Sequence, residues 1–401
     1  MKSRLKKAYQ LVLKSFTVRY LKRNKLGIVA ITGSVGKTST KEAIYQVLSA
    51  KYRVNKNQGN YNNEIGVPLS VLGLGVGGFP FGWIKNVVLG FSKSLSLLSK
   101  NHFDKVILEM GADHPGDIKY LTSFIKPDIA IVTRVACSHL EFFYSQENIA
   151  KEKGMLVEAL DSNGWAILNY DDPNVRKMNK RTKGQVFYFG LDKNADLYAD
   201  EIESDIKGLD FTVHYKNNSK KVHLNIIGKH LIYSALAGIA CGLVYSMKFD
   251  EAIKAIESFH AEKGRLNLVK GIKESLIIND TYNANPESMK AAIQTLNDLA
   301  GKKRKVAVLG DMLELGEGSH EFHREIGKQL VGKADLLFAI GPLSKFIFEE
   351  AEKKMKGKVF WFPDSNSAKD IVREKIQEGD MVLVKGSRGM KMEKIVEAIK
   401  I

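Results

Sequence analysis

The chain has 401 residues, of which 44% are hydrophobic and 26% are charged. This length predicts two or three domains and excludes a single small binding module, and the composition excludes a disordered or collagen-like chain. The two cysteines, Cys137 and Cys241, are too few for a disulfide framework or a four-thiolate zinc site. We therefore expect a globular, cytoplasmic protein.

The net charge of +16 is concentrated at the N-terminus. Residues 1–25 carry nine Lys and Arg and no acidic residue, and the first acidic residue is Glu42. Without that segment, 52 basic and 45 acidic side chains remain. A large positive charge can indicate nucleic-acid binding, but here most of the excess belongs to one short segment, so we expect no specific nucleic-acid partner. Charges interrupt its apolar stretches, which excludes a signal peptide and a membrane span.

Strand and helix patterns alternate through the first half of the chain. The apolar strand 27–32 runs into a glycine-rich turn and a helix at 37–50. Further strands are predicted at 105–110, 128–133 and 165–169, with helices at 116–124 and 146–160. Such alternation is typical of a mainly parallel α/β sheet. Antiparallel strands at 210–215 and 221–226 follow, and then helices at 231–246 and 250–259.

A linker is predicted at 261–265, after which the α/β alternation resumes. Strands are expected at 275–279, 304–309, 334–340, 357–362 and 380–385. The expected fold class is therefore α/β, with a basic amphipathic segment (1–26), a central domain with a mainly parallel sheet (27–262) and a C-terminal Rossmann-like α/β domain (263–401). Two α/β domains imply a cleft between them, which is a common place for a site.

The turn after the first strand, Gly33-Ser-Val-Gly-Lys-Thr38, is a short phosphate-binding loop. Its backbone N–H groups and the following helix N-terminus can hold phosphate, with Lys37 at the β- and γ-phosphates and the Thr38 hydroxyl on Mg²⁺. The alternative is a glycine-rich turn that contains a lysine by chance. The flanking strand and helix favour phosphate binding. The predicted nucleotide contacts are Gly33, Ser34, Val35, Gly36, Lys37, Thr38 and Ser39.

Polar residues also follow other predicted strands. Glu109 ends a strand at the carboxyl edge of the sheet, where ligands bind. His139 follows the strand that ends at Thr133, and Asp311 follows a strand of the last domain. Glu109 and His139 are suited to hard cations, but taken singly such residues are more often solvated or packed. Ordinary turn chemistry would equally explain the polar segments 279–286 and 310–316.

Taken in order, these segments resemble the Mur ligase family. A phosphate-binding loop alone is weakly specific, whereas Tyr282-Asn-Ala-Asn-Pro286 and Gly310-Asp-Met-Leu-Glu-Leu-Gly316 are specific in combination. The resemblance covers about residues 27–400. The stretches that carry it are 32–39, 59–68, 109–116, 139–141, 150–154, 280–286, 310–316 and 385–390.

The resemblance implies an ATP-dependent, ADP-forming ligase of peptidoglycan precursor synthesis. The chain is most similar to members that add D-alanyl-D-alanine to UDP-N-acetylmuramoyl-tripeptide through an acyl-phosphate. Among catalytic and metal-binding residues, the resemblance assigns Lys37 to the phosphates and Thr38 with Glu109 to one Mg²⁺. It assigns His139 to a second Mg²⁺, and Lys153 to the family's carbamylated lysine, whose carbamate supplies an anionic oxygen.

The resemblance also assigns nucleotide contacts beyond the phosphate-binding loop. Arg265 matches the linker arginine that reaches the γ-phosphate. Asn283 and Asn285 lie in the motif that faces adenine, and Asp311 matches the ribose contact.

The sequence departs from the family pattern in three places. The phosphate-binding loop begins at Gly33, whereas typical members place a UDP-binding domain before it, so we expect that domain to be lacking. Arg134 stands where the family has Asn before the metal-binding His, and Leu231 and Ser234 replace two Asn of a helix motif. One alternative is a ligase that joins an amino acid or peptide to a carboxylate acceptor not anchored by UDP, as folate-adding relatives do. Another is a nucleotide-dependent nucleic-acid- or membrane-binding protein without ligase activity.

Two stretches predict basic amphipathic helices. Leu5, Val12, Phe16 and Leu21 recur in the basic segment, and apolar residues recur at helical spacing from Ile84 to Leu98 between Lys85, Lys93 and Lys100. Two interpretations remain open: the helices lie on an anionic membrane, which would make the protein peripheral to the inner face of the membrane, or they pack on each other and cap the sheet.

Overall fold

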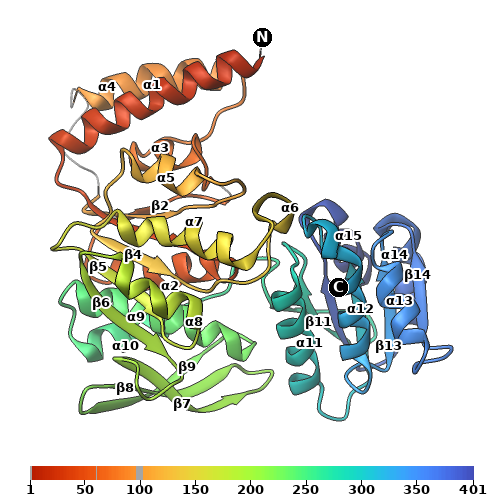
Figure 1. Ribbon diagram of the computed structural model, residues 1–401. Helices are drawn as coiled ribbons and strands as arrows, with labels where there is room; N and C mark the ends of the chain where they lie inside the picture. Colours follow the sequence, from red (N-terminus) through yellow and green to blue (C-terminus); the bar gives the residue numbers. More distant parts are fainter. Residues whose placement is uncertain (1, 60, 96–102) are drawn as a thin grey trace.

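The computed structural model describes residues 2–59, 61–95 and 103–401, so Asn60 of one motif, and Leu98 and Lys100 of the second amphipathic stretch, lie outside the described residues. Two α/β units lie side by side, and a pair of helices sits on the outer side of the first unit (Figure 1). The fold class predicted from the sequence is confirmed. Each unit is built around one sheet, and the two sheets have the strand orders β2-β3-β1-β4-β5-β6-β7-β8-β9 and β10-β11-β15-β12-β13-β14.

The first sheet is parallel from β2 to β7 and antiparallel from β7 to β9. In β1, Val29 and Ile31 contribute to the core on one face of the sheet, whereas Ile28 and Ala30 contribute to the core on the other. The sequence of β1 is a continuous apolar run because both faces of the sheet are buried under other parts of the chain. The strands are β1 (Gly27–Thr32), β2 (Val54–Lys56), β3 (Lys105–Glu109), β4 (Ile129–Val132), β5 (Trp165–Asn169), β6 (Gln185–Gly190), β7 (Leu197–Ser204), β8 (Leu209–Tyr215) and β9 (Asn218–Leu224).

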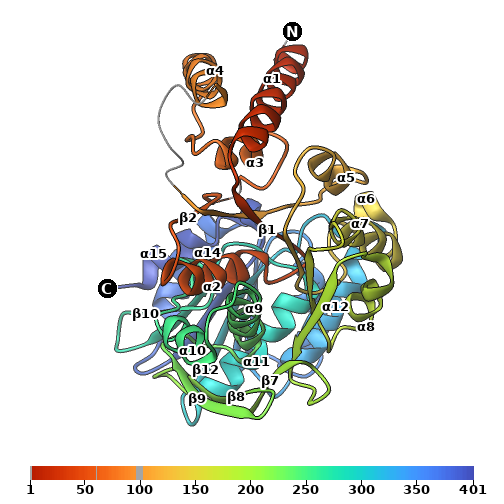
Figure 2. The same cartoon turned by 90° about the vertical axis from the view of Figure 1, so that its left-hand side faces the viewer.

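Helices cover both faces of this sheet (Figures 1 and 2). Two helices, α2 (Lys37–Ser49) and α9 (Ile232–Val244), pack closely because a glycine of α9, Gly238, lies against the backbone of Ala43. The other helices of this unit are α3 (Gly66–Val71), α5 (Asp117–Thr122), α6 (Leu140–Phe143), α7 (Gln146–Glu158), α8 (Pro173–Arg176), η1 (Lys177–Arg181), η2 (Lys229–Leu231) and α10 (Phe249–Ile256).

The second sheet is parallel except for its edge strand β10, which pairs antiparallel with β11. Its strands are β10 (Asn267–Lys270), β11 (Leu276–Asp280), β12 (Lys305–Gly310), β13 (Leu336–Ile340), β14 (Val359–Phe362) and β15 (Met381–Lys385). Its helices are α11 (Pro286–Ala300), η3 (Gly316–Gly318), α12 (Ser319–Leu330), α13 (Lys345–Glu352), α14 (Ser365–Lys375), η4 (Arg388–Met390) and α15 (Glu393–Ile399).

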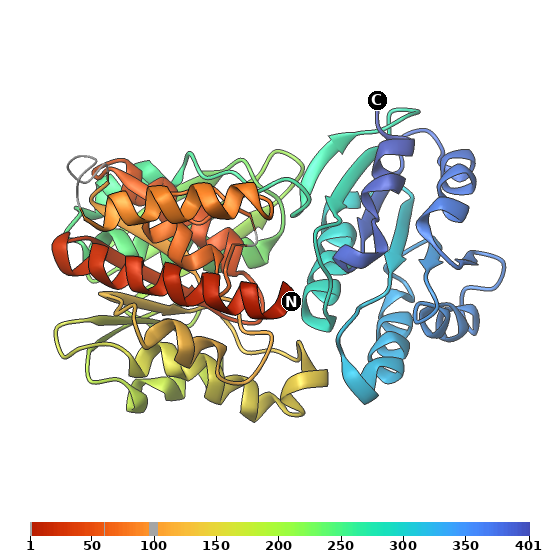
Figure 3. The same ribbon diagram turned by 90° about the horizontal axis from the view of Figure 1, so that it is seen from above.

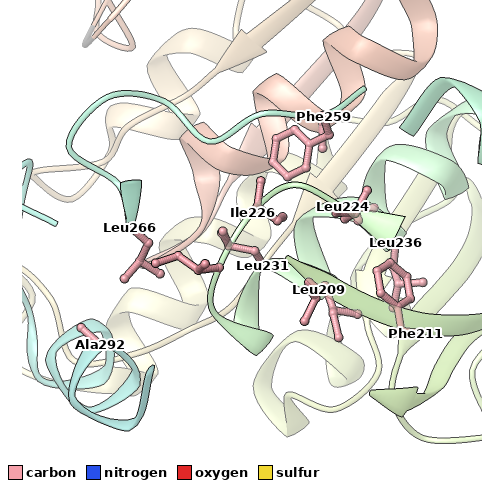
Figure 4. Packing of buried hydrophobic residues seen from close by; sticks show 14 of the residues in the cluster. Leu209, Phe211, Leu224, Ile226, Leu231, Leu236, Phe259, Leu266 and Ala292 are labelled. Atoms are coloured by element: carbon pink, nitrogen blue, oxygen red, sulfur yellow. The ribbon is translucent and has the colours of Figure 1, made fainter. Parts of the chain in front are cut away.

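One hydrophobic core continues from the first unit into the second. Leu266, in the segment between the two sheets, is buried and belongs to the same cluster as Leu231 of η2 and Ala292 of α11. Figure 4 shows Leu266 beside Leu231, with the helix that carries Ala292 next to them. This contact is apolar and buried, so it fixes the position of the second unit relative to the first.

The N-terminal helix α1 (Lys2–Arg23) lies beside α4 (Phe81–Ser94), and the pair stands over α3 (Figures 1 and 2). Tyr9 stacks on Trp83 at 4.3 Å between ring centroids, and Phe16 meets Phe91 edge-on at 6.0 Å. The two helices expected from the sequence are therefore present and pack on each other. None of the helices in the described part of the chain is long and apolar enough to cross a bilayer.

Candidate active site

The phosphate-binding loop connects β1 to α2, as the sequence predicts. A Cβ at Gly33 would collide with Thr133, and Gly36 adopts a left-handed φ of 82° at the start of α2, so both positions favour glycine. Lys37 Nζ donates to the carbonyl oxygen of Gly33 at 2.8 Å. Burial lowers the pKa of Lys37 despite the opposing effect of Glu109.

A cavity of about 740 Å³ opens between the two domains at this loop. Its walls come from the carboxyl ends of strands in both sheets, as expected for ligand sites in α/β proteins. Eleven of the predicted site residues line it: Ser34, Val35, Gly36, Lys37, Thr38, Ser39, Glu109, His139, Arg265, Asn283 and Asn285.

Thr38 is the centre of a hydrogen-bonded chain that joins the two domains. Its Oγ1 donates to Glu109 Oε2 at 2.9 Å and accepts from Arg265 Nη2 at 2.8 Å. The other Glu109 oxygen accepts from Asn62 Nδ2 at 3.1 Å. Arg265 also lies over the Tyr282 ring, 4.0 Å from its centroid. A hydroxyl, a buried carboxylate and a guanidinium thus meet at the phosphate-binding loop.

His139 is the N-cap residue just before α6 and has a left-handed conformation, with φ of 53°. Such backbone is uncommon for a residue other than glycine and is enriched at functional sites. Glu314 Oε2 from the second domain lies 2.7 Å from Nδ1, out of line for a hydrogen bond, and Asp113 Oδ1 lies 3.7 Å from Nε2. Burial lowers the pKa of His139, and the charge of Lys37 lowers it further, which favours the neutral ring.

Lys153 lies on α7, with only 2% of its surface exposed. Burial, together with the positive charge of Lys37, lowers the pKa of Lys153 to about 7, whereas Glu152 and Asp113 raise it. Glu152 accepts hydrogen bonds from the backbone N–H groups of Gly116 and Ile118, both at 2.8 Å. At neutral pH about half of the Lys153 amine is therefore uncharged.

The predicted contacts of the second domain are placed differently. Asn283 and Asn285 line the cavity, but Asn285 also caps α11 by accepting from Ser288 N at 2.9 Å. Asp311 is outside the cavity lining: it is buried, and its Oδ1 accepts from Ser344 N at 2.6 Å. The adenine and ribose roles of these residues stay predictions.

Several cavity residues received no role from the sequence. Asn62 and Glu314 lie within motifs that carry the family resemblance, and these motifs were the signal that could have identified them. Only the folded structure shows that Asn62 contacts Glu109 and that Glu314 contacts His139. Lys385 is buried and donates from Nζ to Asp280 Oδ2 at 2.6 Å. Across the cavity, Arg134 Nη2 lies 3.2 Å from Glu287 Oε2 of the second domain.

The oxygen donors at the loop fit the requirements of Mg²⁺. Among the described residues, no three His, Cys, Asp or Glu side chains converge as a preformed metal cage. Mg²⁺ usually binds to one or two protein oxygens and to substrate phosphates and water. A buried carboxylate beside the Thr38 hydroxyl fits that pattern.

Comparison with known proteins places the chain in a family. Residues 31–78 and 84–242 match the Mur ligase middle domain, and residues 264–388 match the Mur ligase glutamate ligase domain. The chain belongs to the Mur ligase family. The prediction made from the ordered motifs is thereby confirmed, and with it the prediction that the chain is a ligase.

Mur ligases named UDP-N-acetylmuramoyl-tripeptide–D-alanyl-D-alanine ligase are similar over most of the chain. The protein of Bacillus subtilis (strain 168) is 34% identical over 96% of this chain and 78% of its own length. That of Escherichia coli (strain K12) is 32% identical over 93% of this chain and 76% of its own length.

Solved structures agree with this placement. The MurF ligase of Thermotoga maritima in complex with ADP has a TM-score of 0.82 and 28% identity, covering 97% of this chain and 83% of that one. MurF of Acinetobacter baumannii has a TM-score of 0.82 and 27% identity over 97% of this chain and 80% of its own. A folylpolyglutamate synthase of Mycobacterium tuberculosis, 13% identical with a TM-score of 0.70, shares the fold over 96% of this chain and 95% of its own.

Proposed function

We propose that this Mur ligase uses ATP to join D-alanyl-D-alanine to the terminal carboxylate of a UDP-N-acetylmuramoyl-tripeptide and releases ADP. The hydrogen-bonded chain from Arg265 through Thr38 to Glu109 carries the proposal, because it places a cation and a carboxylate from two domains at one phosphate-binding loop. The names of the similar Bacillus and Escherichia proteins support the substrates, and the ADP complex of the Thermotoga enzyme supports the nucleotide.

The reaction has two steps. A carboxylate oxygen of the acceptor attacks the γ-phosphorus, the bond from that phosphorus to the bridging β–γ oxygen breaks, and ADP leaves. The dipeptide amine then attacks the acyl carbon, loses a proton and expels phosphate. Negative charge develops on oxygens in both steps, so Lys37 and Arg265 act as electrostatic stabilisers. Closure of the two domains around the bound substrates would exclude water that otherwise hydrolyses the acyl-phosphate.

Thr38 and Glu109 would hold one Mg²⁺, and His139 with a carbamylated Lys153 would hold a second. Bound Mg²⁺ neutralises phosphate charge and orients the transferred group. The neutral His139 ring offers a lone pair rather than a proton. The backbone of Gly36 and the side chain of Lys37 would position the nucleotide before transfer.

Carbamylation of Lys153 requires an uncharged amine and dissolved CO₂. The amine nitrogen attacks the carbon of CO₂, forms an N–C bond and loses a proton, which leaves a carbamate anion. A lysine with a pKa of about 7 supplies the uncharged amine at neutral pH. The nearby Lys37 would stabilise the anion that results.

We assign the phosphates and metals to residues 27–262, and the adenosine to residues 263–401 through Asn283, Asn285 and Asp311. The protein would act in the cytoplasm, where ATP is available. The second candidate is ligation to a carboxylate acceptor that UDP does not anchor. It is favoured by Arg134, Leu231 and Ser234, which replace the amides expected there.

The test is ADP release with matched acceptors. UDP-N-acetylmuramoyl-tripeptide, the same muramoyl-tripeptide without UDP, and a folate acceptor are each supplied with D-alanyl-D-alanine or with glutamate. The proposal predicts ADP release with UDP-N-acetylmuramoyl-tripeptide and D-alanyl-D-alanine, together with a new amide of the expected mass. Release with the UDP-free acceptor alone would favour the second candidate. No release with any pair would refute both.

A further inference from the structure

Helix α4 presents an apolar face to solvent. Phe81, Ile84, Val88 and Phe91 are 82%, 60%, 62% and 48% exposed, and their spacing of three and four residues places them along one side of the helix. The opposite side is packed, since Gly90 lies against Phe16 and Leu72. A helix on the surface of a soluble domain normally shows the reverse pattern, with its polar side outward.

The neighbouring segments extend this apolar face. Leu5 and Leu11 of α1, and Val76 and Phe79 before α4, are also exposed. Together with the four residues of α4 they make up eight of the sixteen exposed large hydrophobic side chains of the described residues. Single exposed apolar residues need no explanation, but a concentration of this kind marks an interaction surface.

The same surface is strongly basic. No acidic residue occurs in residues 1–41 or in residues 65–103. Exposed cations on the pair are Arg4, Lys7, Arg19, Lys22 and Lys85, and none of these five has a carboxylate partner among the described residues. Two other basic residues of α1 have partners within the first domain: Lys6 pairs with Glu64, and Lys14 lies over the rings of Tyr120 and Phe124.

The basic and apolar residues face the same way. Helix α1 buries Leu13 and Tyr20 against the domain, so helical spacing places Arg4, Leu11 and Lys22 on its outer side. The contacts Tyr9–Trp83 and Phe16–Phe91 show that α1 and α4 run parallel to each other. Figure 3, seen from above, shows both helices uppermost and side by side. We call the outer side of this pair the α1–α4 face.

We propose that the α1–α4 face binds the surface of an anionic phospholipid bilayer. Phe81, Ile84 and Val88 would enter the boundary between headgroups and acyl chains, and the cations of α1 would lie at the lipid phosphates. A second copy of the chain is disfavoured as the occupant, because a symmetric contact would place two basic surfaces opposite each other. Since neither helix is able to span the bilayer, the contact would be peripheral and reversible.

Vesicle co-sedimentation of the full chain tests this proposal. Vesicles of phosphatidylglycerol mixed with phosphatidylcholine are compared with vesicles of phosphatidylcholine alone. The apolar variant is Ile84→Ser with Val88→Ser, and its matched control is Val331→Ser with Ile371→Ser, which are also exposed but lie in the second domain. The charge variant is Lys7→Gln with Lys22→Gln, and its control is Lys180→Gln with Lys254→Gln. All four variants alter exposed side chains, and circular dichroism confirms that they fold.

Wild type and both controls should bind the anionic vesicles and release them as salt is raised. The apolar variant should bind at least tenfold more weakly, and the charge variant about 25-fold, since each cation near an anionic surface contributes about fivefold. The proposal is overturned if wild type fails to bind at about 1 mM lipid, if neutral vesicles bind equally, or if the controls lose as much as the variants. It is also overturned if light scattering shows a dimer that Ile84→Ser with Val88→Ser abolishes. These outcomes are separate from ligase activity, which none of the variants should change.

Discussion

Replacing Lys153 with alanine removes the proposed metal-binding carbamate while leaving the fold of α7. With a pKa of about 7, half of the buried amine is uncharged at pH 7, whereas about one in 3,000 lysines would be uncharged at an ordinary pKa. The structure thus raises the reactive fraction more than a thousandfold. We expect Lys153→Ala to lose about 100-fold or more in kcat, a loss typical for an electrostatic group that acts in the transition state.

The assay is steady-state ADP release, with acetate or propionate added to supply the missing carboxylate. Short acids should restore part of the activity of Lys153→Ala and none of that of a variant altered elsewhere. Lys151→Ala on the same helix, whose side chain is exposed, is the matched control and should keep wild-type activity. Full activity of Lys153→Ala without any acid would refute the role of the carbamate.

The pH dependence gives a second measurement on the same residue. Because the pKa of Lys153 is lowered to about 7, the uncharged fraction of its amine increases as the pH rises through 7. It increases from about a tenth at pH 6 to about nine-tenths at pH 8. At fixed dissolved CO₂, the carbamate signal from ¹³C-labelled bicarbonate should increase by at least this factor until the site is filled, because carbamate formation also releases a proton. A carbamate signal that does not change over this range, or one that survives in Lys153→Ala, would contradict the reasoning.

Three further predictions concern the other groups of the site and its support. Glu109→Gln keeps the shape beside Thr38 but removes the charge, so the Mg²⁺ concentration for half-maximal ADP release should rise about tenfold or more; an unchanged Mg²⁺ titration would exclude Glu109 as a ligand. Arg265→Ala should lower kcat about 100-fold with little change in thermal stability, whereas Lys263→Ala, exposed two residues earlier, should behave as wild type. Gly238→Ala would place a Cβ 3.0 Å from the backbone of Ala43 and should cost about 1–3 kcal/mol in chemical denaturation; equal stability would show that α2 and α9 can move apart.

The sequence predicted the elements whose signals are local. The strand β1, the glycine-rich loop and α2 follow from an apolar run, two glycines and the lysine after them. The end of α2 was predicted within one residue. The parallel pairing of the first sheet followed from the alternation of strands and helices. The antiparallel strands followed from the short alternating segments 210–215 and 221–226, which overlap β8 and β9. These features depend on neighbours in the chain, which a sequence displays directly.

Contacts between distant segments were beyond the sequence. The sequence spacing of Asn62 and Glu109, or of His139 and Glu314, does not indicate that the two side chains of each pair are in contact. The family resemblance assigned Asp311 and Asn285 to the nucleotide, yet each accepts a backbone hydrogen bond that organises its own loop or helix. Local turn chemistry and ligand binding use the same residue types, so only the fold shows what the oxygens contact.

The hydrogen bond from Arg265 to Thr38 joins residues 227 positions apart, and this separation has a consequence for the newly made protein. Domains generally fold in the order in which the ribosome releases them, so the phosphate-binding loop can form long before residue 265 has left the exit tunnel. A nascent chain would then offer a phosphate site without the guanidinium and without the proposed adenosine contacts. On the proposed roles, an unfinished chain does not consume ATP, and turnover begins only when the second domain has been made.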